Sequence, residues 1–260
     1  MRDSWQAGDP YEYYMGRWSK KVANVFVDWL GQGPGLRWLD IGCGSGALSE
    51  AIISNQHPNK VVAVDQSEAF VMKTKQRLGA EVECKIGNAL SLPLDDDAFD
   101  VSISGLVLNF IPEPLKALTE MKRVSIGGGI VGAYVWDYAG DMEFLNYFWD
   151  IAVNLNPKAT DLHEGRRFSN MNAEKLRALF QQVGLSEISS TALDIKTQFA
   201  DFNDYWQPFL GGQGPAPTYV ASLSEFDRNN LRHELQKAIP KQKNGSLKLS
   251  ARAWGIKGLV

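Results

Sequence analysis

Residues 38–50 read WLDIGCGSGALSE, an apolar run that ends in three glycines at alternate positions, Gly42, Gly44 and Gly46. The apolar run predicts a buried strand, and the sequence after the glycines predicts a helix. Glycines permit a tight turn and a close approach of the backbone to a ligand, and the first turn of a helix leaves N–H groups free. This stretch therefore predicts a strand, a glycine turn and a helix arranged to hold a small molecule.

Strand and helix patterns alternate along most of the chain. The predicted helices are 46–54, 68–79, 114–125, 173–184 and 223–239. The predicted strands are 37–42, 60–67, 82–89, 99–110 with its exit loop, 128–138 after a turn at Gly127 to Gly129, 185–199 and 246–258. This alternation indicates an α/β fold with a doubly wound, mostly parallel sheet.

Two segments break the alternation. Residues 139–170 delay the next helix, and residues 204–220, DYWQPFLGGQGPAPTYV, place aromatic side chains among glycines and prolines. We expect the first segment above the strand tips, and the second to be a loop that either roofs a pocket or covers a hydrophobic cluster. The chain is thus interpreted as one domain, 1–260, with an N-terminal helical cover at 1–30 and cap segments at 139–170 and 200–222.

Composition excludes several kinds of partner. The 260 residues are 44% hydrophobic and 22% charged, with a net charge of -3 and no run of basic residues, so we expect no nucleic-acid partner. The first thirty residues lack the apolar core of a signal peptide, and no apolar run is long enough for a membrane span, so we expect a cytoplasmic protein without a membrane partner. Cys43 and Cys84 have no CxxC spacing, and no ligand cluster predicts a metal site.

The glycine turn alone leaves two classes of cofactor open. Gly42, Gly44 and Ala47 also satisfy the dinucleotide pattern GxGxxG/A, and Asp65 is placed to bind a ribose diol in either case. Asp40, however, precedes the turn, where a carboxylate repels a pyrophosphate and attracts an amino group. The ligand is therefore expected to carry a cation near Asp40.

Five motifs in order resemble the class I S-adenosylmethionine-dependent methyltransferases, in the small-molecule branch called type 11 or UbiE-like. They are LDIGCGSG, VVAVDQS, GNALSLPLDDDAFD, SGLVLNFIPEP and MKRVSIGGGIV. The resemblance implies a seven-stranded Rossmann-like sheet with a helical or loop cap, and S-adenosylmethionine as cofactor. It implies that Asp65 accepts bonds from the ribose and that Asn88 and Ala89 meet the adenine edge. The remaining predicted cofactor contacts are Asp40, Gly42, Cys43, Gly44, Gly46, Gln66, Leu90, Ser104 and Gly105.

Three positions depart from the family pattern. Asn88 replaces the usual Asp, although its amide oxygen can still accept a bond from the exocyclic amine of adenine. Asn109 stands where many relatives have His, which removes a candidate base. Gly127 replaces the proline of the usual LKPGG turn.

The N-terminal segment YEYYMGRWS also resembles one that covers the cofactor in this branch. In a helix at residues 14–30, Tyr14 and Arg17 share a face. Arg17 is then a candidate partner of the cofactor's carboxylate. The alternative is a solvated Arg on an N-terminal helix.

Acceptor-side candidates follow the strand tips, because ligands of open α/β sheets lie beyond the carboxyl ends of the strands. Asn109, Trp136 and Asp137 are placed there, with a capped turn or the core as their alternative roles. Further candidates are His163 as a base, Arg166 or Arg167 for an acidic group, and Tyr138 and Trp206 as substrate contacts. A solvated loop His is the alternative for His163.

The predicted reaction is methyl transfer from S-adenosylmethionine to an oxygen, nitrogen or carbon of a small organic molecule. Two alternatives stay open: a non-catalytic adenosine-ligand module that acts through a protein partner, and a nicotinamide-dependent dehydrogenase. Neither the acceptor nor the oligomeric state follows from the sequence.

Overall fold

The computed structural model describes residues 12–169, 171–212 and 214–260. Positions 1–11 of the predicted N-terminal cover, and positions 170 and 213 of the two predicted cap segments, lie outside these described residues. The chain divides into two compact units. The sheet unit comprises residues 19–135, 171–193 and 253–260, and the helical unit comprises the described residues of 12–18, 136–169 and 194–252. The assignment of one domain with cap segments stays a prediction.

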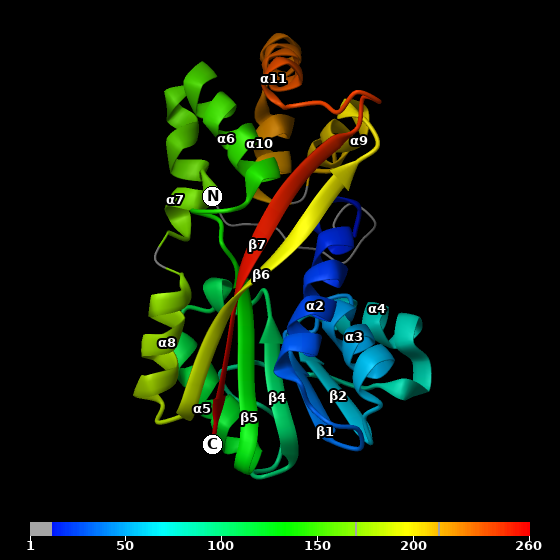
Figure 1. Cartoon of the computed structure of the whole chain (residues 1–260), viewed down its shortest axis with the longest axis vertical. Helices are drawn as coiled ribbons and strands as arrows, with labels where there is room; N and C mark the ends of the chain where they lie inside the picture. The colour runs from blue at the N-terminus through cyan, green and yellow to red at the C-terminus, as the bar shows by residue number, and fades with distance from the viewer. Residues whose placement is uncertain (1–11, 170, 213) are drawn as a thin grey trace. The chain divides into compact units, whose positions relative to one another are not determined.

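One seven-stranded sheet has the order β3-β2-β1-β4-β5-β7-β6. Its strands are β1 (Arg37–Ile41), β2 (Lys60–Asp65), β3 (Glu83–Ile86), β4 (Phe99–Gly105), β5 (Ser125–Trp136), β6 (Ser186–Phe199) and β7 (Leu247–Leu259). The pairs that link β3 to β5 are all parallel, and Figure 1 shows β4 and β5 side by side. This topology confirms the predicted α/β class and the mostly parallel seven-stranded sheet.

The sheet unit is held by a core of strand residues and helix residues. The inner strands supply Leu39, Ile41, Val62 and Val64, all nearly inaccessible to solvent, and Leu118 packs in the same cluster. Runs of aliphatic and β-branched residues suit strands covered on both faces. The near-continuous apolar strands seen in the sequence are therefore explained by burial on both sides.

Some helices of the sheet unit begin at local capping signals. The helices of this unit are α2 (Arg17–Leu30, from its third residue), α3 (Ala47–Gln56), α4 (Glu68–Leu78), α5 (Pro114–Arg123) and α8 (Ala173–Gln182). Asn172 Oδ1 accepts a hydrogen bond of 2.9 Å from the N–H of Lys175 at the start of α8, and Pro114 is the first residue of α5. Helices α3 and α4 contact strands β1 to β3, whereas α5 contacts β4 and α8. The predicted helices are confirmed.

The prediction of a turn at Gly127 to Gly129 is wrong. Strand β5 already begins at Ser125, and the three glycines lie inside it. The pairing with β4 is irregular here, and Gly128 has a φ of 78°. An irregular strand accommodates extra residues by bending, and glycine adopts the required positive φ without strain. The glycines thus mark a bulge within the strand.

The helical unit shows that residues 204–220 are not the predicted loop. This region contains α9 (Phe202–Trp206), a 3₁₀ segment (Gln207–Leu210) and α10 (Pro215–Ser222). The other helical elements of the unit are a π-helical turn (Glu12–Gly16), α6 (Glu143–Leu155), a 3₁₀ segment (Pro157–Leu162), α7 (Glu164–Arg167) and α11 (Glu225–Ala238). The proline positions mislead because Pro208 and Pro215 lie at the starts of these short helices, where a missing N–H costs nothing. Among the described residues, no helix has the length and apolar character needed to cross a bilayer.

Aromatic side chains form the core of the helical unit. Phe148 stacks on Phe209 with ring centres 4.5 Å apart and planes 8° apart. Trp206 and Tyr219 are also buried, and Trp206 packs against Phe209. Of the two interpretations offered for the aromatic segment, the contacts within the unit describe a hydrophobic cluster.

Candidate functional site

The glycine turn after β1 needs glycine for two separate reasons. Gly42, Gly44 and Gly46 all have positive φ, at 74°, 52° and 85°. A Cβ on Gly42 would lie 2.6 Å from Cγ2 of Val107, whereas a Cβ on Gly44 would meet nothing within 4 Å. The turn therefore packs tightly against Val107 at Gly42 and leaves open space at Gly44, where a ligand can approach the backbone.

The carboxylate of Asp65 is fixed by the main chain. Its Oδ2 accepts a hydrogen bond of 3.0 Å from the N–H of Gly44, and its Oδ1 accepts one of 2.9 Å from the N–H of Ser67. Each carboxylate oxygen has two lone pairs, so one on each atom stays available for a ligand hydroxyl. Two free acceptor sites on one rigid carboxylate match the two hydroxyls of a ribose.

A cavity of about 280 Å³ lies in the sheet unit beside this carboxylate. Its walls are Ile41, Gly42, Val64, Asp65, Gln66, Gly87, Asn88, Ala89, Leu90, Val107, Phe110, Ile111 and Pro112. Apolar walls with a few polar groups at fixed positions are typical of small-molecule sites. Six predicted cofactor contacts, Gly42, Asp65, Gln66 and residues 88–90, thus line one cavity.

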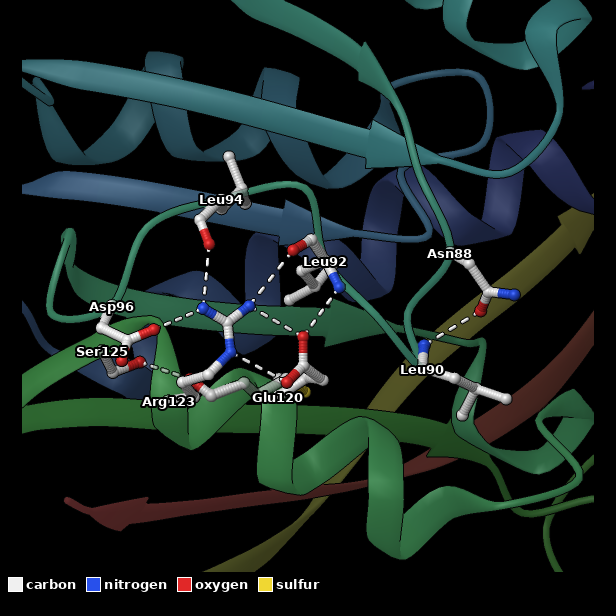
Figure 2. Close-up of polar contacts among 9 residues, drawn as sticks. Asn88, Leu90, Leu92, Leu94, Asp96, Glu120, Arg123 and Ser125 are labelled. Atoms are coloured by element: carbon white, nitrogen blue, oxygen red, sulfur yellow. Dashed lines mark hydrogen bonds and ion pairs between the residues drawn. The ribbon is translucent and has the colours of Figure 1, made fainter.

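Residues 88–91 form a short turn whose first three residues line the cavity, and Figure 2 shows Asn88 and Leu90 of this turn. Asn88 Oδ1 accepts a hydrogen bond of 2.9 Å from the N–H of Leu90, and the N–H of Ser91 donates to the main-chain oxygen of Asn88 at 3.0 Å. From the family resemblance, the amide oxygen of Asn88 is expected to accept a hydrogen bond from adenine. In the structure, that oxygen already accepts one bond from the main chain.

A charged cluster holds the chain that follows this turn. Arg123 donates to the main-chain oxygens of Leu92 and Leu94 and to the carboxylates of Asp96 and Glu120 (Figure 2). Glu120 in turn accepts from the N–H of Leu92, at 2.8 Å. The hydrogen bond from Arg123 lowers the pKa of Glu120, and the two carboxylates raise the pKa of Arg123. The chain at residues 92–96, which follows the cavity-lining residues 88–90, is thereby tied to helix α5.

Asp40 lies one residue before the cavity wall and is 1% exposed. Its Oδ2 accepts a hydrogen bond of 2.7 Å from Ser49 Oγ, but its Oδ1 is buried and has no partner in the described residues. Burial, and to a lesser degree the nearby charge of Asp65, raises the pKa of Asp40 to about 7. A nearby cation would stabilise this carboxylate, which fits the amino group of the predicted cofactor. Asp40 is not among the cavity-lining residues.

Four other predicted contacts support the turn from within the protein. The thiol of Cys43 is buried, which raises its pKa, so it is not a nucleophile. Ser104 Oγ donates to the main-chain oxygen of Ile41 at 2.9 Å, and a Cβ on Gly105 would lie 2.5 Å from the hydroxyl oxygen of Tyr134. Gly46 is the residue before α3. These positions shape the site but do not line its cavity.

The exit loop after β4 lines the cavity through residues other than the one chosen from it as a candidate. Val107, Phe110, Ile111 and Pro112 line the cavity, whereas Asn109, the residue chosen from this loop, does not. Both amide atoms of Asn109 are buried without a hydrogen-bond partner in the described chain. The apolar residues that flank Asn109 were the available signal, because a flat aromatic ligand needs apolar walls more than polar ones.

The N-terminal candidates lie in the helical unit. Arg17 Nη1 donates to Asp204 Oδ1 at 3.0 Å, and the guanidinium carbon lies 4.4 Å from the ring centre of Trp18 and 4.6 Å from that of Phe199. The hydroxyl of Tyr14 is buried without a partner in the described residues, and burial raises the pKa of Tyr14. Arg17 is therefore paired with a carboxylate of the protein, Asp204, and not with the carboxylate of a ligand.

Other acceptor-side candidates also have contacts within the helical unit. Asp137 Oδ2 accepts a bond of 3.3 Å from the N–H of Asp141, Trp136 is 3% exposed, and the ring of Tyr138 lies 5.2 Å from that of Phe168. These are turn and core environments. Arg166 is exposed, and Trp206 belongs to the aromatic core described above.

His163 caps helix α7. Its Nδ1 accepts a bond of 3.0 Å from the N–H of Gly165, its ring stacks on Trp149, and its Nε2 lies 3.9 Å from Asp150 Oδ1. Burial lowers the pKa of His163. Since Nδ1 accepts a bond, the neutral ring carries its proton on Nε2, which leaves no free basic nitrogen. No cluster of three or more metal-ligating side chains occurs within the described ranges.

Comparisons with known proteins agree on one family. A model described as a methyltransferase domain matches residues 39–132. A demethylmenaquinone methyltransferase of Alkalihalophilus pseudofirmus is 30% identical over 173 residues, which cover 60% of this chain and 72% of that protein. The matches to four other curated relatives span only 36% to 51% of their lengths.

Solved structures share the fold at low identity. A phosphoethanolamine N-methyltransferase of Haemonchus contortus, solved with S-adenosylhomocysteine, has a TM-score of 0.59 at 16% identity, with coverage of 96% of this chain and 56% of that one. A [4+2]-cyclase has a TM-score of 0.55 at 16% identity, with coverage of 100% and 88%. Likeness at this level establishes the fold, and the fold alone does not fix the reaction.

Proposed function

The chain belongs to the S-adenosylmethionine-dependent methyltransferases, and from that premise we propose that it transfers the methyl group of this cofactor to an oxygen, nitrogen or carbon atom of a small organic molecule. The observation that carries the proposal is the cavity beside the glycine turn, where the fixed carboxylate of Asp65 and residues 88–90 line the same space. S-adenosylmethionine is the cofactor of this family, as predicted.

The residues of the sheet unit account for binding and orientation. Asp65 holds the ribose through its two unused lone pairs, and Val107, Phe110 and Ile111 give the base an apolar slot. Asp40, whose Oδ1 is buried without a partner in the described residues, would compensate the positively charged amino group. When bound, the cofactor supplies a methyl group on a cationic sulfur. The protein then needs chiefly to position the acceptor and exclude water.

Asn109 has the strongest support among the acceptor-side candidates. An unpartnered buried carboxamide costs free energy unless a ligand pairs with it. Asp137, His163, Trp136, Tyr138, Arg166 and Trp206 stay proposals for the acceptor side. For His163 the cap on α7 is the better supported role, because its Nδ1 is used by Gly165.

The name of the Alkalihalophilus relative makes quinone precursors the first acceptors to test. The non-catalytic module and the dehydrogenase are not favoured, since the compared relatives with named activities include methyltransferases and Asp40 opposes a pyrophosphate. A cytoplasmic location and the absence of a nucleic-acid partner remain predictions from composition.

Calorimetry and an acceptor screen test the proposal. S-adenosylhomocysteine should bind the purified chain at least about tenfold more tightly than NAD. A screen of quinone precursors, phenols and amines with S-adenosylmethionine should then release S-adenosylhomocysteine with one of them. Equal or tighter binding of NAD would overturn the cofactor assignment. Tight cofactor binding with no methylated product in the screen would favour the non-catalytic module.

A further inference from the structure

The orientation of the Asn88 carboxamide determines whether a hydrogen-bond donor or an acceptor faces a purine ring in the cavity. The hydrogen bond of 2.9 Å from the N–H of Leu90 must end on an oxygen, because a main-chain N–H cannot donate to an NH₂ group. This bond therefore identifies Oδ1 as the end that faces Leu90. Figure 2 shows the nitrogen end on the side away from Leu90.

An aspartate in this position would present a different group. With one of its oxygens bonded to Leu90, the other end of an aspartate would be a second acceptor. In Asn88 the corresponding end is an NH₂ group, which only donates. Asn88 lines the cavity, so the difference concerns a group placed at the ligand.

We propose that Asn88 presents a hydrogen-bond donor to the purine edge, so that this site discriminates less against a 6-oxopurine than an aspartate would. The inference rests on the proposed function, because it takes the cavity to hold the nucleoside part of the cofactor. Adenine carries a donating amino group at C6, whereas a 6-oxopurine carries an accepting oxygen there. A donor at residue 88 pairs with the oxygen and opposes the amino group.

Two features of the turn keep this donor in place. The N–H of Ser91 donates to the main-chain oxygen of Asn88 at 3.0 Å, and Leu92 is held from both of its main-chain polar groups by Glu120 and Arg123. Rotating the carboxamide to present its oxygen would place the NH₂ group against the N–H of Leu90. That arrangement breaks one hydrogen bond and opposes two donors.

The test compares S-adenosylhomocysteine with S-inosylhomocysteine, which differs in the C6 substituent and the N1 proton, by calorimetry on the full chain. Asn88→Asp retains an oxygen for Leu90 and replaces the donor by an acceptor. It should bind S-adenosylhomocysteine more tightly than the wild type and S-inosylhomocysteine more weakly. The dissociation constant of S-inosylhomocysteine divided by that of S-adenosylhomocysteine should rise at least about tenfold. A tenfold change is about the lower end for a charge-assisted hydrogen bond.

Ser91→Asp is the matched control, because Ser91 is the partner of Asn88 in the turn but does not line the cavity. It adds the same charge nearby and should change the ratio less than about twofold. Asn88→Ala removes both groups and should give a ratio between those of the wild type and Asn88→Asp. Thermal melting of each variant separates these effects from loss of the fold.

An equal ratio in the wild type and Asn88→Asp, or an equal rise in Ser91→Asp, would overturn the inference while leaving the proposed function intact. Failure of the wild type to bind S-adenosylhomocysteine would overturn the proposed function, and this inference with it. The two failures are therefore distinguishable in the same set of titrations.

Discussion

In the sheet unit, the polar groups that line the cavity keep hydrogen-bonding capacity, whereas in the helical unit several polar candidates are paired within the protein. Asp65 is fixed by two main-chain N–H groups and still has free lone pairs. Arg17, by contrast, is paired with Asp204, and Nδ1 of His163 is used at the start of α7. A polar residue near a predicted site is thus informative only when its partners are known.

The largest expected effect concerns Asp65. Asp65→Ala should weaken the binding of S-adenosylhomocysteine by about 30- to 1,000-fold, or about 2 to 4 kcal/mol, because it removes charge-assisted bonds to the ribose. Calorimetry measures the change. Asp95→Ala, an exposed carboxylate of the same unit, is the control. Unchanged affinity in a folded Asp65→Ala variant would show that the cavity is not the ribose site.

Asn109 and Asp137 test the contrast between the units directly. Once the screen provides an acceptor, Asn109→Ala should lower turnover by about a hundredfold and leave cofactor affinity within about threefold, since small misplacements of a reacting group are costly. Asp137→Ala should instead lower the free energy of unfolding by about 1 kcal/mol, as for loss of a local side-chain cap. Steady-state kinetics and urea unfolding separate the two effects. An Asp137→Ala variant that is fully stable but inactive would contradict the structural role assigned to Asp137.

Gly42 and Gly44 test how tightly the turn packs against Val107. Gly42→Ala should lower the free energy of unfolding by about 2 to 3 kcal/mol, because the new Cβ meets Val107 and the positive φ is strained. Gly44→Ala, with the same sign of φ and open space around it, should cost about 1 kcal/mol. Urea unfolding at one pH compares them. Equal losses would show that the contact with Val107 is not tight.

Asp40 predicts how stability depends on pH. Its pKa is raised to about 7 in the folded chain from 3.8, so between about pH 4 and pH 7 the folded chain keeps a proton that the unfolded chain has released. This group's contribution to stability is therefore present at low pH and is lost as the pH rises to 7, by up to about 1.4 kcal/mol per pH unit. Asp40→Asn should remove that slope in urea unfolding across pH 5 to 8. Parallel pH profiles for the two proteins would contradict the buried, protonated acid.

Arg17 gives the smallest expected effect. Because it pairs with Asp204 at a partly exposed position, Arg17→Met should lower the free energy of unfolding by about 1 kcal/mol or less and leave cofactor affinity within about threefold. Lys248→Met, an exposed lysine of the same unit, controls for the lost charge. A loss of affinity of tenfold or more would assign Arg17 to the cofactor's carboxylate, as the sequence predicts.

The strands of the sheet and most of its helices could be anticipated because they depend on local signals. Alternating apolar runs, the glycine turn and Pro114 at the start of α5 act over a few residues. The glycines of β5 were misjudged for a related reason. A bulge is defined by the pairing with β4, and a single strand's sequence does not contain its partner.

The site was predictable to the extent that the main chain fixes it. Asp65 and residues 88–90 line the cavity because motif spacing determines their backbone positions. The role of Arg17 could not be found this way, because its partner Asp204 lies 187 residues further along the chain. His163 caps α7, which has only four residues and therefore leaves no periodic pattern in the sequence. The hydrogen bond that the oxygen of Asn88 accepts from the N–H of Leu90 likewise appears only in the structure.

The cluster at Arg123 has a consequence for protein engineering. The guanidinium of Arg123 donates hydrogen bonds to Leu92, Leu94 and Asp96 and to Glu120 on α5. The segment that follows Asn88 is therefore attached to a helix by several hydrogen bonds. Substitutions at residue 88 that are meant to accept unnatural cofactors are therefore made next to a segment with a fixed position. A change in base preference caused by a substitution at residue 88 should reflect the chemistry of the new side chain, because the hydrogen bonds of Arg123 hold the adjacent segment in place.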